Sequence, residues 1–216
     1  MTIAEPAVLS VQVGRVAPLG PDLVPSGFVK RPVDGPVRVG TLGLAGDQQA
    51  DLQVHGGPEK AVYAYAGGNY PLWAAEFPEH TARLSPGAFG ENLTIAGLTE
   101  ADLCAGDIHA IGTARLQVCQ PRQPCFKFAL HFDDKRMPRA MVRSGRSGWY
   151  YRVLAEGVLQ AGDPVRLAER PYPELPFTRL VAIVNGGEAN AADRARIAQA
   201  AGVAGWLREA ARQGTG

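Results

Sequence analysis

The sequence predicts an α+β protein: a mainly β unit, either a barrel or a folded sheet with helices, followed by a small three-helix unit. Between residues 8 and 167, short runs rich in β-branched residues are separated by many of the chain's 26 glycines and 17 prolines, a pattern typical of barrels and folded sheets. From residue 176 the composition turns to alanine, arginine and leucine, which favour helices. We therefore expect a β-barrel domain over residues 1–170 and a three-helix domain over residues 171–216.

The strands are predicted from apolar–polar alternation and from the turn residues between them. Residues 8–16 alternate apolar and polar positions, as a half-buried strand does. The other predicted strands, in chain order, are residues 27–30, 36–39, 52–55, 92–95, 107–111, 114–119, 148–154 and 164–167.

Two helices are predicted within the β unit: residues 69–77, with Asn69 as the N-cap, and residues 126 to about 132. The proline-rich segment 170–176 then marks the domain boundary. Beyond it, glycines separate three short amphipathic segments, which we expect to be helices packed on one another or on the barrel. These segments are residues 176–184, 190–201 and 204–212.

Composition limits the class of protein. The three cysteines form no even disulfide framework and the N-terminus lacks signal-peptide character, so we expect a cytoplasmic protein. No stretch is apolar enough to span a membrane, and a formal net charge of +1 argues against a nucleic-acid or membrane binder. The expected partner is a small molecule, and the sequence leaves the oligomeric state, including a homodimer, open.

Charge is nevertheless uneven along the chain. Residues 115–152 hold nine Lys/Arg and two Asp, a net +7, so the remaining chain carries +1 minus +7, or −6. Such a cationic segment can attract an anionic ligand such as a phosphate, but it can equally be the solvated face of a helix.

Residues 120–127 hold the most suggestive side chain, the Cys125 thiol. Pro121 and Pro124 stiffen the backbone before it, and Arg122 and Lys127 flank it. Nearby cations, together with the start of a predicted helix at residue 126, favour the thiolate, which is both a nucleophile and a metal ligand. The alternative is a buried structural cysteine without chemistry.

Two glycine-rich loops offer further polar groups. Residues 46–60 include His55, followed by Gly56 and Gly57, where an imidazole would lie beside backbone that a ligand can approach closely. Asp47 and Asp51 in this segment are expected to cap turns or to pair with cations. The second loop, residues 87–93, offers Glu91 and Asn92, which can recognise a ligand edge or brace neighbouring backbone. The sequence contains no paired Cys-x-x-Cys zinc motif, dinucleotide-binding glycine loop or Walker sequence.

Together these three blocks resemble the signature blocks of MOSC-domain proteins, named for the C-terminal domain of molybdenum cofactor sulfurase. The blocks are Gly46-Asp47-x-Gln49-Ala50-Asp51 leading to His55-Gly56-Gly57-Pro58-x-Lys60-Ala61, then Gly87-Ala88-Phe89-Gly90-Glu91-Asn92, then Gln120-Pro121-Arg122-Gln123-Pro124-Cys125. The resemblance is strongest to the YiiM-like branch, which also carries a three-helix C-terminal domain.

The resemblance implies a MOSC-type β-barrel that binds molybdenum cofactor, a molybdopterin that a recombinant protein can lack. It implies that Cys125 is the protein ligand to molybdenum, a soft thiolate that suits the metal. Arg122, Lys30 and His55 are candidates to hold the cofactor phosphate or to polarise a substrate oxygen, and Cys125, His55 and Arg122 are the catalytic candidates. The remaining implied cofactor contacts are Gly56, Gly57, Glu91 and Asn92.

The implied activity is reduction of N-hydroxylated compounds, such as N-hydroxylated purines, with electrons from a separate protein. A second reading also uses the Cys125 thiol: a carrier that delivers sulfur, as a persulfide, or molybdenum cofactor to a partner enzyme. The sequence alone does not separate these two readings.

Overall fold

The computed structural model of the chain describes residues 5–51 and 56–214. The strand predicted at residues 52–55, and with it His55, lies outside the described residues. None of the helices in the described part of the chain is long and apolar enough to cross a membrane.

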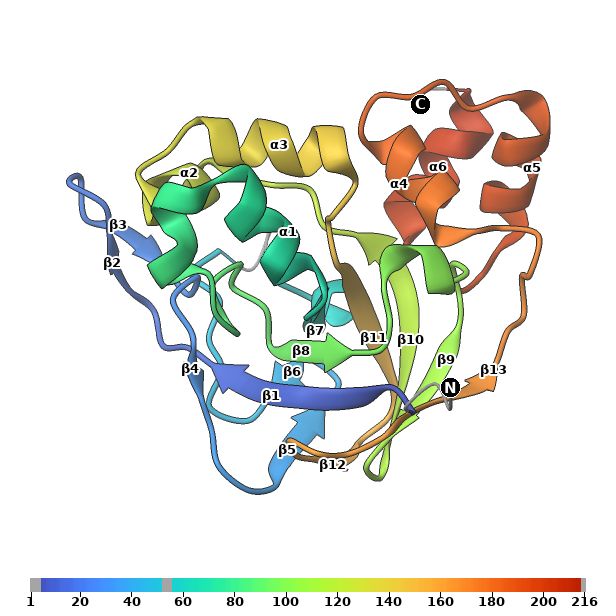
Figure 1. The fold of residues 1–216 in the computed structure, drawn as a ribbon. Helices are drawn as coiled ribbons and strands as arrows, with labels where there is room; N and C mark the ends of the chain where they lie inside the picture. The colour runs from blue at the N-terminus through green and yellow to red at the C-terminus, as the bar shows by residue number, and fades with distance from the viewer. Residues whose placement is uncertain (1–4, 52–55, 215–216) are drawn as a thin grey trace.

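An eight-stranded mixed sheet forms the frame of the molecule (Figure 1). The strand order is β13-β9-β10-β11-β7-β8-β1-β4, and within it the β7–β8 pair is parallel while the other pairs are antiparallel. The strands are β1 (Ala7–Val13), β4 (Arg31–Pro32), β7 (Val62–Ala66), β8 (Leu93–Ala96), β9 (Ile108–Ile111), β10 (Ala114–Pro121), β11 (Trp149–Ala155) and β13 (Val165–Glu169).

The sheet curls toward a barrel, because its β13 end returns to β1. Ala7 and Pro164 form an isolated antiparallel bridge at this seam. The Val165 amide donates to the Pro6 carbonyl at 2.7 Å, and the Val8 amide donates to the Asp163 carbonyl at 2.9 Å. The predicted α+β class is confirmed, with a barrel-like sheet whose seam is a short bridge rather than a full strand ladder.

Two smaller sheets complete the β structure. One contains β5 (Val37–Gly40), β6 (Gly43–Leu44) and β12 (Gly157–Leu159), and the other pairs β2 (Ala17–Leu19) with β3 (Val24–Ser26). The strand predicted at residues 27–30 is wrong: this segment has no strand pairing. The Phe28 amide donates to Ser26 Oγ instead of to a neighbouring strand, and Gly27 approaches the Gln48 carbonyl so closely that a Cβ would lie 2.1 Å from it.

The helices confirm most of the predicted ranges. They are α1 (Asn69–Glu76), α2 (Phe126–Phe132), α3 (Arg136–Ser144), α4 (Phe177–Val184), α5 (Ala191–Gln199) and α6 (Gly205–Gln213), with 3-10 turns η1 (Pro58–Lys60), η2 (Pro78–Arg83) and η3 (Glu100–Asp102). The predicted cap Asn69 is instead the first residue of α1, and its amide donates to the buried Glu100 carboxylate. Helix α3 was not predicted.

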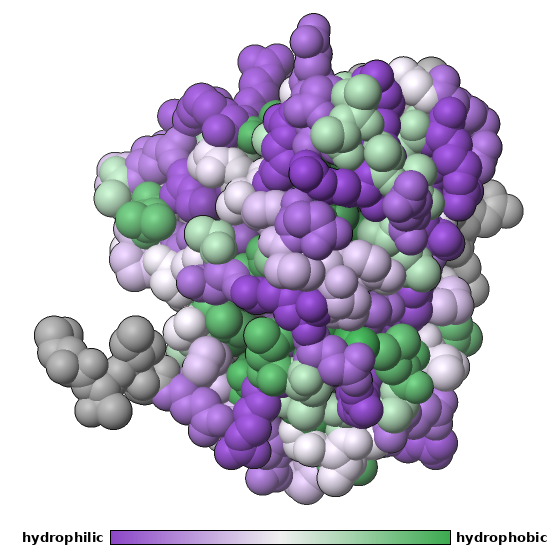
Figure 2. All heavy atoms as spheres, turned by 90° about the vertical axis from the view of Figure 1, so that its right-hand side faces the viewer, coloured by the Kyte–Doolittle hydropathy of each residue, from purple (hydrophilic) through white to green (hydrophobic). Residues whose placement is uncertain are grey.

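Two hydrophobic clusters stabilise this arrangement. The first joins the sheet to α4, α5 and α6, so the C-terminal helices share a core with the strands. The second lies among α1, α2 and α3 and is aromatic, with Trp73, Phe89 and Phe128 fully buried in it. In Figure 1 these two groups of helices lie side by side above the sheet. Figure 2 shows that the surface over the C-terminal helices is largely hydrophilic, while hydrophobic residues gather below them.

The shared core does not test the predicted domain boundary at residue 170, which stays a prediction.

Candidate functional site

One pocket collects residues from all three sequence blocks. It lies where the segment after β3, the segment after β6, the loop before β8 and the β10–α2 connection meet. Its lining consists of Ser26, Gly27, Phe28, Lys30, Asp47, Gln49, Ala50, Lys60, Tyr63, Phe89, Gly90, Asn92, Arg122, Gln123, Cys125, Lys127 and Tyr150. Segments that are distant in sequence therefore line one pocket, which brings together four of the expected site residues: Lys30, Asn92, Arg122 and Cys125.

Cys125 lies at the junction between a strand and a helix. Strand β10 ends at Pro121, and α2 begins at Phe126, so Cys125 is the N-cap residue with an extended backbone (φ −106°, ψ 171°). Its carbonyl accepts a hydrogen bond from the Phe128 amide at 3.0 Å, while its half-buried side chain belongs to the pocket wall.

Arg122 is a buried cation in the pocket wall. Its guanidinium donates to the Phe89 carbonyl at 2.6 Å and lies over the rings of Phe28, Tyr63 and Phe128 at 5.0–5.4 Å from their centroids. Burial alone would lower the pKa of Arg122, but Tyr63, Tyr150 and Cys125 raise it above its usual range, so the side chain stays charged. Within the described residues it has no carboxylate partner, which leaves a buried positive charge for a ligand to compensate.

The pocket as a whole is cationic. Among the described residues of the lining, the cations are Lys30, Lys60, Arg122 and Lys127 and the one acid is Asp47, so their formal charges sum to +4 minus 1, or +3. The Lys127 ammonium donates to the Pro25 carbonyl at 2.9 Å, and its side chain is largely buried. The lining therefore suits an anionic ligand.

Lys30 is held by a chain of buried polar groups. Its ammonium pairs with Asp47 Oδ1, which also accepts from the Gly14 amide at 2.7 Å. Asp47 Oδ2 accepts from the Asn92 amide at 2.9 Å, and Asn92 Oδ1 accepts from the Tyr63 amide at 3.1 Å. Burial lowers the pKa of Lys30, against the opposing effect of Asp47. The prediction that Asp47 pairs with a cation is confirmed.

Glu91 and Asn92 support the pocket rather than present open groups to it. The fully buried Glu91 carboxylate accepts from the Gly87 and Phe89 amides at 2.7 and 3.1 Å and from the Thr94 hydroxyl at 2.8 Å, as well as from the Tyr70 hydroxyl. Glu91 is not part of the lining. The predicted direct contact of Glu91 with the cofactor therefore becomes a bracing role for the loop that carries Phe89.

Gly57 occupies a backbone region (φ 92°, ψ 169°) that glycine adopts far more readily than other residues. Neither Gly56 nor Gly57 belongs to the described pocket lining, and His55 lies outside the described residues.

Sequence reasoning missed Tyr63 and Tyr150, which line the pocket from β7 and β11. Burial raises the pKa of both phenols, so they remain protonated, and the Tyr63 hydroxyl donates to the Ser147 carbonyl at 2.9 Å.

The cationic segment 115–152 divides between the pocket and the surface. Arg122 and Lys127 belong to the pocket, whereas Arg143 and Arg146 pair with Glu76 on the surface. Arg115 and Arg152 are also in ion pairs, with Glu169 and Glu59. The segment thus divides between the pocket lining and ion pairs outside it, and the attraction of an anionic ligand stays a prediction.

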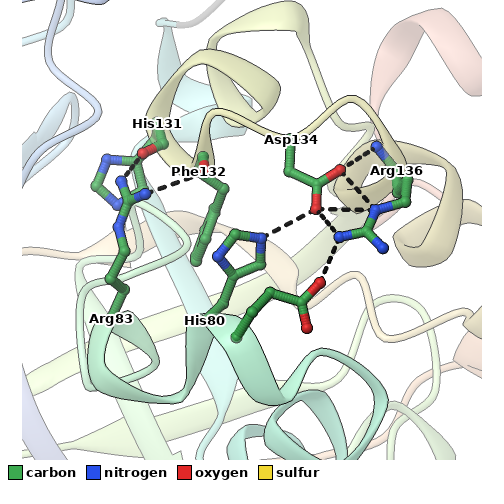
Figure 3. A network of polar contacts seen from close by, with 7 residues as sticks. His80, Arg83, His131, Phe132, Asp134 and Arg136 are labelled. Atoms are coloured by element: carbon green, nitrogen blue, oxygen red, sulfur yellow. Dashed lines mark hydrogen bonds and ion pairs between the residues drawn. The ribbon is translucent and has the colours of Figure 1, made fainter.

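Glu79, His80 and Asp134 form a further titratable cluster, drawn in Figure 3. His80 Nε2 lies 3.0 Å from Asp134, and Arg136 pairs with both Asp134 and Glu79. The bound guanidinium makes this an ion-pair network rather than a metal site. This network connects η2 to the segment between α2 and α3. Arg83 of η2 adds a further contact to the end of α2, because it donates to the Phe132 carbonyl at 3.0 Å.

The other two cysteines are structural. Cys119 Sγ donates to the Glu59 carbonyl at 3.0 Å, and burial raises the pKa of Cys119 to about 12. Cys104 is buried with Sγ 3.6 Å from the Pro173 carbonyl, and burial raises its pKa also. None of the three cysteines, all of which lie in the described residues, forms a disulfide.

A barrel-like sheet with a thiol at the wall of a cationic pocket defines a class of protein whose site is suited to an anionic ligand next to a potential sulfur ligand. The comparisons with known proteins specify this class. Residues 51–166, more than half of the chain, match the MOSC domain family. The chain belongs to this family and is a YiiM-like MOSC protein.

The relatives support that assignment over most of the chain. Protein YiiM of Escherichia coli is 44% identical over 150 residues, covering 69% of this chain and 67% of the relative. The uncharacterized protein YflK of Bacillus subtilis is 43% identical, covering 76% and 74%. A protein of Gibberella moniliformis named Reductase is 39% identical over 77% of this chain, which corresponds to 30% of its own length.

Solved structures agree with the fold. The crystal structure of YiiM from Geobacillus stearothermophilus aligns with a TM-score of 0.81 at 35% identity, covering 98% of this chain and 100% of the other. That of YiiM from Escherichia coli aligns with a TM-score of 0.76 at 34% identity, covering 92% of each chain.

Proposed function

We propose that this protein is a reductase of N-hydroxylated compounds that uses molybdenum cofactor bound in the pocket of Cys125. The observation that carries the proposal is the placement of the Cys125 thiol in the wall of a pocket with four cations and one carboxylate, in a MOSC-family chain. The fungal relative that is named Reductase is consistent with a reductive activity.

The donor set of the pocket fits the cofactor. A cysteine thiolate is a soft ligand suited to a metal already bound by sulfur, and Cys125 would supply it. The buried Arg122 guanidinium lacks a carboxylate partner among the described residues and would hold a phosphate together with Lys127 and Lys30. When bound, the cofactor supplies the two-electron redox chemistry for cleavage of an N–O bond.

The remaining requirements of the reaction fall on the chain itself. An N-hydroxylated substrate takes up two electrons and two protons; its N–O bond breaks, and the amine and water leave. Among the proton-bearing groups of the described lining, burial lowers the pKa of the Lys30 and Lys60 ammonium groups and raises the pKa of the Tyr63 and Tyr150 phenols, so the two lysines are the better proton donors. The Tyr150 ring, the least buried of the aromatic side chains in the lining, offers an apolar contact for a heterocyclic substrate such as an N-hydroxylated purine.

Substitution of Cys125 by serine tests the proposal. Wild-type and variant protein are produced in a host that makes molybdenum cofactor, and molybdenum content and reduction of an N-hydroxylated purine by reduced benzyl viologen are measured. We expect Cys125→Ser to lower the rate by about 100-fold or more, because changes outside the ligand shell already cost about 10–100-fold.

The matched control is Cys104→Ser, which changes a buried cysteine outside the pocket and lets the serine hydroxyl donate to the same carbonyl. It should retain wild-type content and rate. Full molybdenum content and full activity in Cys125→Ser would refute the proposal. A persulfide on Cys125 in protein that reduces no substrate would favour the carrier reading instead.

A further inference from the structure

A second cavity adjoins the pocket of Cys125 on the side of the β5–β6 hairpin, and we call it the hairpin cavity. Its volume of about 680 Å³ falls within the range of about 300–1,000 Å³ that is typical of small-molecule sites. Residues 40–45 of the hairpin form much of its wall. Asp47 and Gln49 line both cavities, so a molecule in the hairpin cavity would lie next to the contents of the pocket.

The hairpin cavity differs in charge from the cationic pocket. Each charged residue of its described lining is already in an ion pair: Arg38 with Glu156 at 3.3 Å, and Asp47 with Lys30. The other described lining residues are uncharged, some apolar, such as Leu42, and some polar. This lining suits an uncharged ligand, whereas the neighbouring pocket suits an anion.

Gln49 lies where the two cavities meet, and its carboxamide has no hydrogen-bond partner among the described residues. The side chain lies against the hairpin, since a Cβ added to Gly43 would be 3.8 Å from Gln49 Nε2. That Cβ would also be 2.7 Å from the Ala61 carbonyl, so glycine keeps this approach open. The neighbouring Gln48 differs, because its side chain accepts from the Val16 amide at 3.0 Å. Of these two amides, the one at Gln49 is therefore available to a ligand.

A carboxamide can recognise the edge of a purine with one donor and one acceptor. Its NH2 group donates to a ring nitrogen, and its oxygen accepts from the exocyclic N–H, as glutamine does with adenine in nucleic acids. On an N-hydroxylated adenine these bonds use nitrogen atoms only. The hydroxyl oxygen that the reaction removes stays available to the pocket of Cys125.

We infer that the hairpin cavity is the substrate site, and that Gln49 selects uncharged N-hydroxylated purines, as free base or nucleoside, by binding the ring edge beside the N–O bond. This inference rests on the proposed reductase function and adds the recognition of the substrate to it. The exocyclic nitrogen ends as an amine and the oxygen leaves as water, with two electrons from an external donor and two protons. Gln49 orients the ring and transfers neither.

The test measures kcat/KM of the molybdenum-loaded full chain with reduced benzyl viologen as the electron source. The two substrates are N-hydroxylated adenine and N-hydroxyaniline, which has the same N–O group on a ring without nitrogen. Gln49→Leu removes both bonding groups, and Gln49→Glu keeps the shape but loses the donor; either variant suffices if the other fails to fold. The control is Gln160→Leu, at an exposed glutamine outside both linings.

We expect both Gln49 variants to lower kcat/KM for N-hydroxylated adenine by about tenfold, mainly through KM, because one bidentate pair with a base discriminates by about that factor. Their kcat/KM for N-hydroxyaniline and their molybdenum content should match the wild type, and Gln160→Leu should match it throughout. The wild type should gain nothing from a phosphate on the substrate. N-hydroxylated adenosine should therefore be reduced at least as efficiently as its monophosphate.

The inference is overturned if the Gln49 variants keep the wild-type kcat/KM for N-hydroxylated adenine. It is also overturned if they lose both substrates equally or bind less molybdenum, because Gln49 would then serve the fold or the cofactor. A monophosphate that is reduced tenfold more efficiently than the nucleoside overturns it too. Molybdenum content keeps the adenine result decisive where N-hydroxyaniline is not reduced.

These outcomes are distinct from failure of the proposed function. Turnover of N-hydroxylated adenine by the wild type, with the same kcat/KM in the Gln49 variants, contradicts the substrate recognition alone. Loaded wild-type protein that reduces neither substrate contradicts the reductase function as well.

Discussion

Arg122 illustrates how a single residue can serve the ligand rather than the fold. Its guanidinium is buried among three aromatic rings and has one short hydrogen bond, to the Phe89 carbonyl. Taking a charge out of water without an opposite charge costs several kcal/mol. We therefore interpret Arg122 as a residue whose buried charge is partly compensated by its neighbours Tyr63, Tyr150 and Cys125 and would be compensated further by an anion in the pocket.

The variant Arg122→Met separates these two roles. Loss of the bond to Phe89 costs about 1–3 kcal/mol, and removal of the partly compensated charge offsets a similar amount. We expect the unfolding free energy without ligand to stay within about 1 kcal/mol of the wild type. Inorganic phosphate should stabilise the wild type, by about 2.7 kcal/mol at a hundredfold excess over Kd, but not the variant.

The measurement is urea unfolding with and without phosphate, with Arg115→Met as the control because Arg115 forms an exposed ion pair. An equal phosphate effect in Arg122→Met and the wild type would contradict the role assigned to Arg122.

At the scale of elements, the loop of residues 87–92 positions the pocket wall through Glu91. The Glu91 carboxylate binds amides and hydroxyls of its own loop, of α1 and of β8, and the same loop presents the Phe89 carbonyl to Arg122. Each of these contacts requires an acceptor, which both carboxylate oxygens provide.

The variant Glu91→Gln replaces one carboxylate oxygen by an NH2 group, which cannot accept a hydrogen bond from the donors around it. We expect it to lower the unfolding free energy by about 2–3 kcal/mol, since buried hydrogen bonds to charged groups contribute about 1.5–3 kcal/mol. Urea unfolding measures the effect, and the same change at the exposed Glu174 should leave stability close to that of the wild type. Wild-type stability of Glu91→Gln would disprove the bracing role.

Prediction from the sequence worked best for the part of the site whose residues are adjacent in the chain. Cys125, Arg122 and the start of α2 are adjacent in the chain, so the prolines and charges around them predicted a thiol between cations. Helix α3 escaped prediction because it carries Pro138, which argues against a helix in sequence but lies in its first turn, where proline is tolerated. Strand β7 escaped because all five of its residues are buried, so it lacks apolar–polar alternation.

Other parts of the site could not be derived from local patterns. Tyr63 and Tyr150 occupy adjacent central strands, where aromatic residues normally indicate core packing, and only the β11–β7 register brings the two together. The orientation of the Glu91 side chain could not be predicted from sequence either, because a carboxylate beside glycines can face a ligand or the backbone amides of its own loop.

For the whole molecule, buried histidines link stability to pH. His109 is 2% exposed and shares a 2.6 Å hydrogen bond with the Tyr151 hydroxyl, and burial lowers the pKa of His109 from 6.5 to about 4. Between pH 6.5 and 4 the unfolded chain binds a proton at His109 that the folded protein does not. The stability due to neutral His109 is therefore complete above pH 6.5 and is lost as the pH falls toward 4.

The difference amounts to about 3 kcal/mol at roughly 1.4 kcal/mol per pH unit. Asparagine at position 109 places an amide near the position of Nδ1 and does not titrate. We expect the wild type to lose about 3 kcal/mol more unfolding free energy than His109→Asn between pH 6.5 and pH 4. Parallel pH profiles of urea unfolding for the two proteins would contradict this interpretation.

The central claim is that Cys125 supplies sulfur to molybdenum in the cationic pocket, and X-ray absorption at the molybdenum edge tests it most directly. Wild-type protein and Cys125→Ser, both loaded in a cofactor-competent host, are compared for the number of sulfur neighbours of the metal. We predict one fewer sulfur neighbour in Cys125→Ser, with a lighter atom or none in its place. Identical sulfur counts in the two proteins would contradict the claim.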